Sequence, residues 1–307
     1  MLTHHVPTPA APARVVILGS RGFVGAHLSG HLRAAGMAVE DVPSSEVDLT
    51  NDTAPELLAQ RLRKDDAVVF VSALTPDKGR DIATMMRNMR MGESVCLALQ
   101  KTPCAHVVYV SSDAVYADEA NPVRETSCTA PGSFHGTMHL VRERMLIETT
   151  RTAKIPLALL RPSLLYGPGD THNGYGPNRF VRTALQDGTI ALFGGGEEKR
   201  DHVYSGDVSR LSELVLRHRS QGALNIATGH AVSFADVAAH VRTAAGRDVA
   251  IATSPRANPI THRHFDTTEI ARAFPTFAPI MPAEGVAQTI ARLAAGAAST
   301  GRRGVSA

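Results

Sequence analysis

The glycine-rich segment Gly19-Ser20-Arg21-Gly22-Phe23-Val24-Gly25 is the part of the sequence whose residue types and spacing point most directly to chemistry. It follows the apolar run Arg14–Leu18 and opens a helical pattern that extends through Ala35. The first glycine permits a tight turn, the second lets a pyrophosphate approach the backbone, and the third lets the helix lie close to the strand. The amides at the start of the helix favour anionic phosphates. A strand, a glycine turn and a helix in this order predict a dinucleotide-binding loop, although the glycines alone would also suit an ordinary turn.

Two histidines, His135 and His139, lie four residues apart in a predicted helix over residues 134–150. This spacing places both imidazoles on one helix face, one turn apart. A neutral imidazole accepts or donates a proton near neutral pH because its reference pKa is about 6.5, so His135 is a candidate acid-base residue. Glu143 falls on the same face and makes the three side chains a candidate metal site, although His135 is not followed by the Glu of metalloprotease helices.

The elements that must position these residues alternate along the first half of the chain. Strand patterns occupy residues 14–18, 38–42, 67–71, 106–110 and 157–160, and helical patterns occupy 23–35, 54–63, 81–100 and 134–150. Such alternation predicts an α/β fold, a Rossmann-type doubly wound parallel sheet over residues 14–166 with helices on both faces.

The pattern changes after residue 166 into loops rich in Gly, Pro and Asn. Short helices are predicted near residues 178–186 and 208–218, and short strands at 189–193 and 223–226. We expect residues 167–295 to form mainly a smaller C-terminal α/β substrate-binding part, interleaved with the Rossmann sheet. Residues 1–13 and 296–307 are small, polar or proline-rich, which predicts flexible tails.

The composition is that of one enzyme-sized unit. The 307 residues are 43% hydrophobic and 20% charged, enough for a sizeable core. The net charge of +3 contains no block of five or six like charges, so neither nucleic acid nor an anionic membrane is required as a partner. No apolar run approaches the roughly 20 residues of a membrane span. Cys96, Cys104 and Cys128 lack metal-ligand spacing, and the N-terminus lacks a signal-peptide pattern, so we expect a cytoplasmic protein.

Four motifs occur in the order found in extended short-chain dehydrogenases/reductases. They are the glycine segment, Ser111–Tyr116, Arg161–Gly169 and Lys199–Val208. From about Arg14 to Ala295 the chain resembles the nucleotide-sugar epimerases, dehydratases and reductases of that family. The resemblance implies a Rossmann fold, bound NAD or NADP, and a sugar nucleotide held by the C-terminal part.

The family carries a Tyr and, four residues later, a Lys at the start of a long helix, and this chain has His135 and His139 at those positions. The resemblance implies that His135 exchanges a proton with a sugar hydroxyl and that His139 binds the nicotinamide ribose. An imidazole reaches less far than a phenol, and a neutral His139 lacks the permanent charge of a lysine. A catalytically silent nucleotide-binding protein of the same fold is therefore a second hypothesis, and the metal site is a third.

Ser112 aligns with the family Ser or Thr that hydrogen-bonds the reacting oxygen at the carboxyl end of a strand, where ligands of open α/β sheets gather. Asp113 aligns with the proton-donating Asp of the dehydratases, but Ala114 replaces their Glu base, so dehydration is disfavoured. The ordinary alternatives are a Ser112 hydroxyl that caps a local backbone group and an Asp113 side chain that forms a turn.

The choice of cofactor depends on the end of the second strand, where NAD enzymes place an acidic residue. Here the strand runs into Pro43-Ser44-Ser45, and Glu40 and Asp41 fall too early. Arg21 with Ser44 and Ser45 opposite suits a 2′-phosphate, which slightly favours NADP over NAD. The resemblance further implies cofactor contacts from Asp48, Leu49, Ser72, Ala73, Leu74 and Pro162.

The substrate residues are also implied by the resemblance. Asn178, Arg179 and Arg200 match positions that meet the sugar-nucleotide diphosphate, for which the planar fork of arginine is suited. Phe193 matches the aromatic residue that stacks on the nucleobase. Family members usually dimerise through their two long helices, here residues 81–100 and 134–150, so we expect a homodimer.

Overall fold

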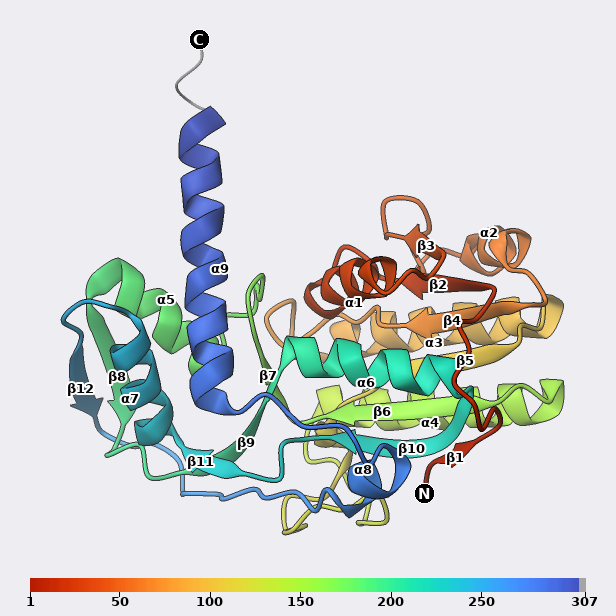
Figure 1. The fold of residues 1–307 in the computed structure, drawn as a ribbon. Helices are drawn as coiled ribbons and strands as arrows, with labels where there is room; N and C mark the ends of the chain where they lie inside the picture. The colour runs from red at the N-terminus through yellow and green to blue at the C-terminus, as the bar shows by residue number, and fades with distance from the viewer. Residues whose placement is uncertain (304–307) are drawn as a thin grey trace.

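The computed structural model of the chain describes the backbone of residues 1–303 and the side chains of residues 1–295. The larger of its two parts is built on a seven-stranded sheet in the order β1-β10-β6-β5-β4-β2-β3 (Figure 1). The strands are β1 (Thr3–His4), β2 (Arg14–Leu18), β3 (Val39–Val42), β4 (Asp66–Phe70), β5 (His106–Val110), β6 (Leu157–Pro162) and β10 (Ser220–Ile226). All neighbours are parallel except β1 and β10. Side chains of β4, β5 and β6 are buried on both faces, which explains their continuous apolar runs.

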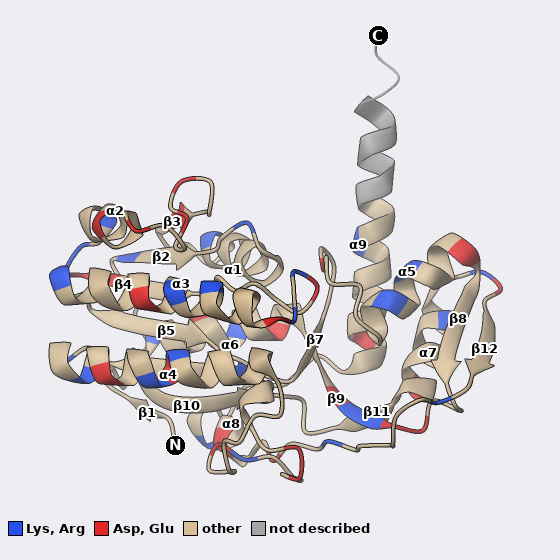
Figure 2. Ribbon diagram, turned by 180° about the vertical axis from the view of Figure 1, so that it is seen from behind, with Lys and Arg blue, Asp and Glu red and all other residues tan. Residues whose placement is uncertain are grey.

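Helices cover both faces of this sheet. The helices are α1 (Phe23–Ala34) and α6 (Ser205–Arg217) on one face, and α2 (Ala54–Arg61), α3 (Ile82–Lys101) and α4 (Phe134–Ala153) on the other (Figures 1 and 2). Alternate residues of β2 serve the two layers: Ile17 packs in the cluster under α1 and α6, and Leu18 packs in the cluster under α2 and α3. This arrangement confirms the predicted α/β class and the doubly wound sheet.

The smaller part contains two short sheets, ordered β11-β9-β7 and β12-β8. Its elements are β7 (Leu164–Tyr166), α5 (Pro177–Asp187), β8 (Thr189–Phe193), β9 (Lys199–Tyr204), β11 (Ala231–Ser233), α7 (Phe234–Ala244), β12 (Ala250–Ser254) and α9 (Pro282–Arg303). Phe180, Ile190 and Val237 belong to its core cluster. No helix in the described part of the chain is long and apolar enough to cross a membrane.

The chain passes between the two parts more than once. After β9 it returns to the larger part as α6 and β10, and α8 (Thr268–Ala273) also packs against β10. Residues 205–226 therefore complete the Rossmann sheet, although they lie within the range 167–295 that we expected to serve mainly substrate binding.

The prediction of a flexible tail over residues 1–13 was wrong. Thr3 and His4 pair with β10, the Leu2 side chain is buried, and the His4 ring stacks on His218 with 4.4 Å between ring centroids. A two-residue strand is too short to produce an alternating pattern, so the sequence does not reveal it. At the other end α9 stays helical to Arg303, beyond the predicted tail start at residue 296, and residues 304–307 lie outside the described part.

Candidate active site

The glycine loop connects β2 to α1 and is held tightly in place. Gly19 has a φ of +92°, and a Cβ atom there would lie 2.9 Å from the backbone of Ser72, while a Cβ at Gly25 would overlap the carbonyl of Gly19. Phe23 and Val24 form the half-buried first turn of α1. Within the described chain no side chain caps the first amides of α1, and its first turn holds no acidic residue. The loop therefore presents free amides to an anion.

Two further features of the loop fit a dinucleotide. A Cβ at Gly22 would meet only the Gly19 carbonyl oxygen, at 3.3 Å, so the surface in front of this residue is open to a phosphate. The hydroxyl of Ser20 is buried and has no hydrogen-bond partner among the described residues. A buried hydroxyl without a partner is costly, and a bound phosphate oxygen would satisfy it. The residues present therefore fit the pyrophosphate of a nicotinamide dinucleotide.

The two carboxylates of β3 are paired with arginines. Glu40 forms an ion pair with Arg14 at 3.2 Å, and Asp41 forms one with Arg33 at 2.7 Å. In contrast, Arg21 donates to the Ser45 hydroxyl at 3.0 Å on the exposed side of the loop, and Ser44 is exposed beside Ser45. The structure thus brings together the arginine and serine that the sequence singled out for a 2′-phosphate.

The segment Ser72-Ala73-Leu74 follows β4 and lies beside the glycine loop, because the Ser72 amide donates to the Leu18 carbonyl at 3.0 Å. All three residues are half-buried at the carboxyl end of the strand. Pro162 ends β6 and is buried where that strand pairs with Ile226. These positions lie at the sheet edge where ligands of open α/β folds bind.

Asp48 and Leu49 are less available than the resemblance implied. The Leu49 side chain is buried in the core, and Asp48 Oδ1 accepts hydrogen bonds from the Thr50 amide at 3.0 Å and the Thr50 hydroxyl at 2.8 Å. These bonds lower the pKa of Asp48. Only the second carboxylate oxygen of Asp48 or the backbone would be available here to contact an adenine.

His135 lies in the first turn of α4, which Ser133 caps by accepting the Gly136 amide at 3.1 Å. The half-buried imidazole lines a cavity of about 270 Å³, here called the smaller cavity. Its other lining residues include Leu74 after β4, Met85 and Asn88 of α3, and Ser133 and Met138. Burial lowers the pKa of His135 to about 4, and the nearby charges of His172 and Arg142 act in the same direction. His135 is therefore neutral at neutral pH.

His139 lies one turn further along α4, and its ring meets that of His135 edge to face with centroids 4.7 Å apart. The structure therefore brings together the two imidazoles as the spacing predicted. His139 is buried, and its Nδ1 lies 2.7 Å from the phenol oxygen of Tyr109 on β5. Burial, His135 and Arg142 hold the pKa of His139 well below its ordinary value, so this position carries no permanent charge.

Glu143 is not placed beside the two histidines as the metal hypothesis requires. Glu143 is buried and bound through both carboxylate oxygens to Arg161, at 2.9 and 2.6 Å, so it is not available beside the histidines. The Nδ1 atom of His139 faces Tyr109. Within the described residues, no three His, Cys, Asp or Glu side chains are grouped to hold a metal ion.

Ser112 and Asp113 follow β5 and start a short 3-10 helix over Asp113–Val115. Ser112 Oγ accepts the Ala114 amide at 3.1 Å, which is the local capping that we considered as its ordinary role, and it makes only a 3.5 Å contact with the Asp113 carboxylate. Asp113 forms an ion pair with Arg263 at 3.2 Å. Burial nevertheless raises the pKa of the Asp113 carboxyl above its ordinary value.

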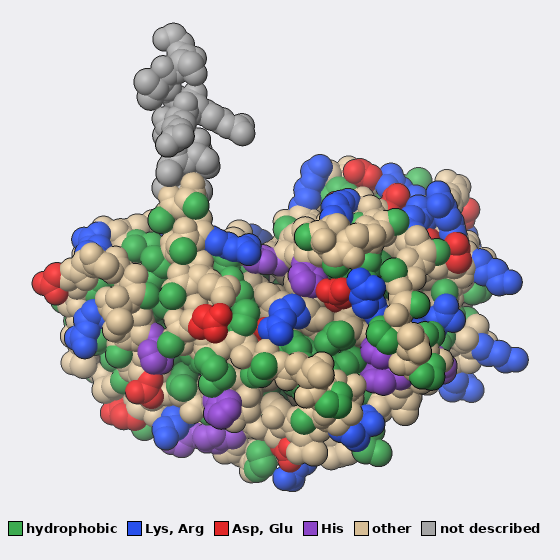
Figure 3. Space-filling view, viewed as in Figure 1, with side chains coloured by type: hydrophobic (Ala, Val, Ile, Leu, Met, Phe, Trp, Pro, Cys, Tyr) green, Lys and Arg blue, Asp and Glu red, His purple; other side chains and the backbone are tan. Residues whose placement is uncertain are grey.

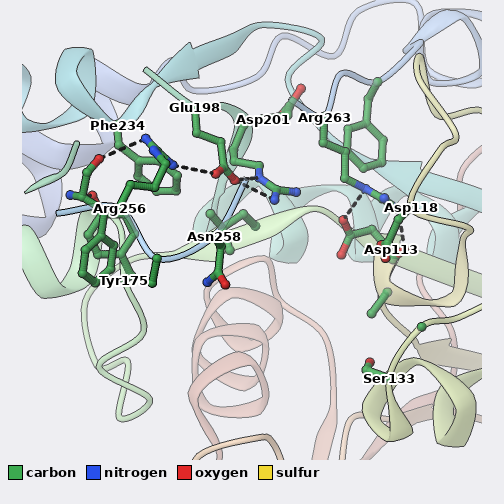
Figure 4. Close-up of a pocket in the computed structure, with 17 residues that line it drawn as sticks. Asp113, Asp118, Ser133, Tyr175, Glu198, Asp201, Phe234, Arg256, Asn258 and Arg263 are labelled. Atoms are coloured by element: carbon green, nitrogen blue, oxygen red, sulfur yellow. Dashed lines mark hydrogen bonds and ion pairs between the residues drawn. The ribbon is translucent and has the colours of Figure 1, made fainter. Parts of the chain in front are cut away.

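Asp113 also lines a cavity of about 590 Å³ between the two parts, here called the larger cavity (Figure 4). Figure 3 shows one face of the molecule, with the larger and smaller parts on either side of a depression. Phe193 of β8 lines the larger cavity with its ring stacked on Tyr175, 4.6 Å between centroids. Glu198 lies between Arg200 and Arg256, at 2.7 and 3.4 Å (Figure 4).

Five residues were predicted to bind substrate, namely Ser112, Asn178, Arg179, Phe193 and Arg200. The structure places Phe193 and Arg200 in the lining of the larger cavity, and Ser112 lies outside that lining, next to Asp113. Asn178 and Arg179 do not line it: the Asn178 side chain accepts the Gly167 amide at 3.0 Å, and Arg179 is exposed. Lining residues that the sequence missed include Tyr175, Glu198, Arg256 and Arg263. Of these four, only Glu198 carried a signal, since it directly precedes the motif Lys199–Val208.

Comparison with known proteins identifies the family of the chain. The family model for the NAD dependent epimerase/dehydratase family matches residues 15–227. The ADP-L-glycero-D-manno-heptose-6-epimerase of Cupriavidus pinatubonensis is 26% identical over 252 residues, which cover 73% of this chain and 76% of that protein.

Solved structures show the same fold. The UDP-glucose 4-epimerase of Thermus thermophilus, in complex with NAD, superposes with a TM-score of 0.78 at 21% identity, over 92% of this chain and 99% of the other. The GDP-L-fucose synthetase of Naegleria fowleri, bound to NADP, gives a TM-score of 0.85 at 15% identity, over 95% and 96%. Because the family model spans more than half of the chain, the protein belongs to the NAD dependent epimerase/dehydratase family.

Proposed function

We propose that this protein is an NAD(P)-dependent epimerase or reductase that acts on a nucleotide-linked sugar, with His135 as the residue that moves the proton. The observation that carries the proposal is that the two cavities meet at the first turn of α4. Ser133 lines both cavities, and His135, two residues later, lines the smaller one. A proton carrier is needed where the cofactor and substrate sites adjoin, and His135 occupies that place.

The nicotinamide, when bound, supplies the hydride donor or acceptor. Neutral His135 accepts the proton of a sugar hydroxyl at its unprotonated ring nitrogen and returns it in the reverse step. Ser112 keeps its hydroxyl hydrogen available to the same sugar oxygen, because its oxygen accepts the Ala114 amide and its contact with Asp113 is long. His139 orients the cofactor ribose from the next turn of α4.

The larger cavity suits a nucleoside diphosphate. The diphosphate would take the place of Glu198 between Arg200 and Arg256, and the nucleobase would stack on Phe193, whose side chain is 44% exposed. The names of the relatives above include ADP-, UDP- and GDP-linked sugars, so the base is left open. Asp201 also lines this cavity, but its carboxylate accepts the Thr228 and Gly229 amides, so we assign it a structural role.

We favour NADP over NAD as the cofactor. The contact between Arg21 and Ser45 supports this choice, and so does the pairing of Glu40 and Asp41 with other arginines, since a 2′-phosphate needs a cation and tolerates no free carboxylate. Calorimetric dissociation constants for both dinucleotides test it, and tighter binding of NAD would reverse it.

The catalytically silent hypothesis has one specific observation in its favour. The position of the family lysine holds a buried, neutral His139 that is bonded to Tyr109, so its fixed charge is missing. A silent protein would bind dinucleotide and sugar nucleotide without any change in nicotinamide absorbance and without any conversion of the sugar.

We also propose a homodimer through α3 and α4, which lie side by side on the outer face (Figure 2). These helices expose large apolar side chains at Ile82, Met86, Leu97, Phe134, Val141 and Ile147. Light scattering of the wild type and of Met86→Glu tests the interface. A monomeric wild type would refute this assembly.

The decisive experiment for the function is a ligand screen followed by an absorbance assay. Thermal shifts with NAD, NADP and a panel of sugar nucleotides identify the ligands, because a ligand of the native state stabilises it by mass action. The best pair is then mixed with enzyme and followed through the reduced nicotinamide absorbance and the sugar product. Binding without turnover by the wild type would support the silent hypothesis and refute the enzyme.

A further inference from the structure

Arg142 of α4 is a fully buried guanidinium that the proposed reaction does not yet use. Among the described residues, no carboxylate lies within ion-pair distance of it. Its partners are carbonyl oxygens: Nε donates to the Asn88 backbone at 2.7 Å, one terminal nitrogen donates to the Ser72 carbonyl at 2.8 Å, and the group lies over the Phe70 ring, 4.8 Å from its centroid. A buried charge without a counter-charge is costly, so its position calls for an explanation.

Tyr109 links this charge to the histidine pair. Its phenol is fully buried on β5, 2.7 Å from His139 Nδ1 and close to the Arg142 guanidinium. Burial raises the pKa of Tyr109 to about 12 despite that guanidinium, so the phenol keeps its proton. The positive charge attracts the oxygen end of the O–H dipole, which directs the hydrogen towards His139 Nδ1. The remaining proton of neutral His139 then lies on Nε2.

We propose, in an inference that rests on the proposed function, that Tyr109 and Arg142 are positioning residues that together take over the role of the family lysine. Tyr109 fixes His139 as the Nε2–H tautomer, the form that donates a hydrogen bond to a ribose oxygen. Arg142, one turn after His139 in α4, supplies the fixed positive charge.

Arg142 also ties the histidines to the segment Ser72-Ala73-Leu74. Besides its bond to Ser72, it contacts Asn88 Oδ1 at 3.3 Å, and Asn88 holds both the amide and the carbonyl of Leu74 at 2.9 Å. One guanidinium therefore supports α4, α3 and the segment predicted to line the cofactor. Gly92 of α3 makes room for it, since a Cβ there would lie 2.9 Å from Arg142 Cγ.

The tautomer is tested without substrate by long-range ¹⁵N–¹H correlation spectra of the full-length protein labelled at histidine, with His139 assigned by His139→Gln. We expect an unprotonated Nδ1 and a protonated Nε2 in the wild type, and a mixture of tautomers in Tyr109→Phe. Tyr116→Phe is the matched control, because this buried phenol bonds Arg161 and Asn225. A protonated Nδ1 in the wild type, or an unchanged spectrum in Tyr109→Phe, would overturn the role of Tyr109.

The charge is tested by titrating His135 in Arg142→Met and Arg142→Lys. Burial, which is the main cause of the low pKa of His135, and the charge of His172 both remain in these variants. We therefore expect the pKa to rise measurably above about 4 in the Met variant and to stay low in the Lys variant. A merely structural role would not distinguish the two variants by charge. Equal pKa values in the wild type and the Met variant would refute the role of Arg142, and if that variant does not fold, the Lys variant must still keep the low pKa.

Cofactor affinity gives a third, separate readout. Tyr109→Phe should weaken dinucleotide binding by about 3- to 10-fold through the loss of one oriented hydrogen bond, and Tyr116→Phe should not. A correct tautomer in a protein without turnover would refute the proposed function alone. Turnover in a protein with the opposite tautomer would refute this inference alone.

Discussion

Gly136 of α4 packs directly against the carbonyl of Ala114, so that a Cβ atom on this glycine would overlap the oxygen and lie 2.9 Å from the carbonyl carbon. The first turn of α4 and the short helix after β5 are therefore in backbone contact. This contact sets the separation of His135 from Ser112 and Asp113. The proposed proton carrier, His135, and the hydroxyl proposed to orient substrate, Ser112, come from elements more than twenty residues apart, and the contact of Gly136 joins these elements.

Gly136→Ala should therefore damage the site more than its size suggests. We expect a loss of about 1 to 3 kcal/mol in the free energy of unfolding from overpacking, together with a large drop in turnover. Urea unfolding and steady-state kinetics measure the two effects. Gly30→Ala in α1 is the matched control, because its Cβ would meet nothing within 4 Å, and this change should leave stability equal or higher. Normal turnover in Gly136→Ala would show that the contact does not set the catalytic geometry.

The glycine loop makes a prediction that separates binding from folding. Gly22→Val should abolish dinucleotide binding and leave the fold largely intact, because its side chain would occupy the open space in front of the loop. Gly25→Ala should destabilise the fold, since its Cβ overlaps the Gly19 carbonyl. Calorimetry and thermal melting of both variants test the pair. A Gly22→Val protein that binds NADP with unchanged affinity would contradict the phosphate-binding role of this loop.

The fold was predictable because its strongest signals are local. β2, β4 and β5 are continuous apolar runs, and a parallel sheet that is buried on both faces produces such runs. β1 was not predicted, because its two residues form a strand only by pairing with β10, more than two hundred residues away. Its burial depends on the finished fold and leaves no periodic pattern.

The candidate site was only half predictable for a related reason. His135, Phe193 and Arg200 stand at positions that the resemblance marks, whereas Arg256 and Arg263 come from the irregular segment after β12. Arg263 meets the Asp113 carbonyl from 150 residues away, a contact that tertiary packing alone creates. The resemblance implies that His139 stands at the position of a family lysine, but the sequence does not reveal that Arg142, one turn further along α4, is fully buried.

The larger cavity predicts a contrast between two arginines that the sequence treated alike. Arg200→Ala should weaken sugar-nucleotide binding by about 1.5 to 3 kcal/mol, the value of a charge-assisted hydrogen bond, because Arg200 lines the cavity. Arg179→Ala should have little effect, because its side chain is exposed outside that lining. Dissociation constants for the best sugar nucleotide decide between them. Equal losses in both variants would place the diphosphate elsewhere.

Two buried histidines other than His135 and His139 predict acid sensitivity. Burial lowers the pKa of His106 to about 4 and of His202 to about 3, below their unfolded value near 6.5. The unfolded chain therefore binds protons first, and stability falls as the pH drops below about 6.5. At pH 5 each histidine should cost roughly 2 kcal/mol relative to neutral pH.

The variant His202→Phe tests how much of the stability loss at acid pH comes from His202. Neither ring nitrogen of His202 has a hydrogen-bond partner among the described residues, and its ring packs on Phe234, so an apolar ring is tolerated there. Urea unfolding should show a smaller loss between neutral pH and pH 5 in this variant than in the wild type. His230→Gln, at an exposed position, serves as the control. A pH dependence unchanged by His202→Phe would contradict the assignment.

The pH dependence of turnover provides the sharpest test of His135. The sequence predicted a titration near neutrality, but burial in the smaller cavity lowers the pKa to about 4. The base form therefore prevails at neutral pH, and a rate that requires it should fall only as the pH drops towards about 4. His135→Phe should reduce turnover by about 10²- to 10⁴-fold with nearly unchanged cofactor affinity.

His139→Ala should behave differently from His135→Phe, because loss of the ribose contact weakens cofactor binding together with rate. The double change His135→Tyr with His139→Lys restores the family pair, and a silent protein with an intact site would gain activity from it. Kinetics and calorimetry on the three variants separate these cases. If His135→Phe kept full turnover on the true substrate, the proton would have to travel through Ser112, Asp113 or water, because no other acid-base side chain is proposed to reach the sugar hydroxyl.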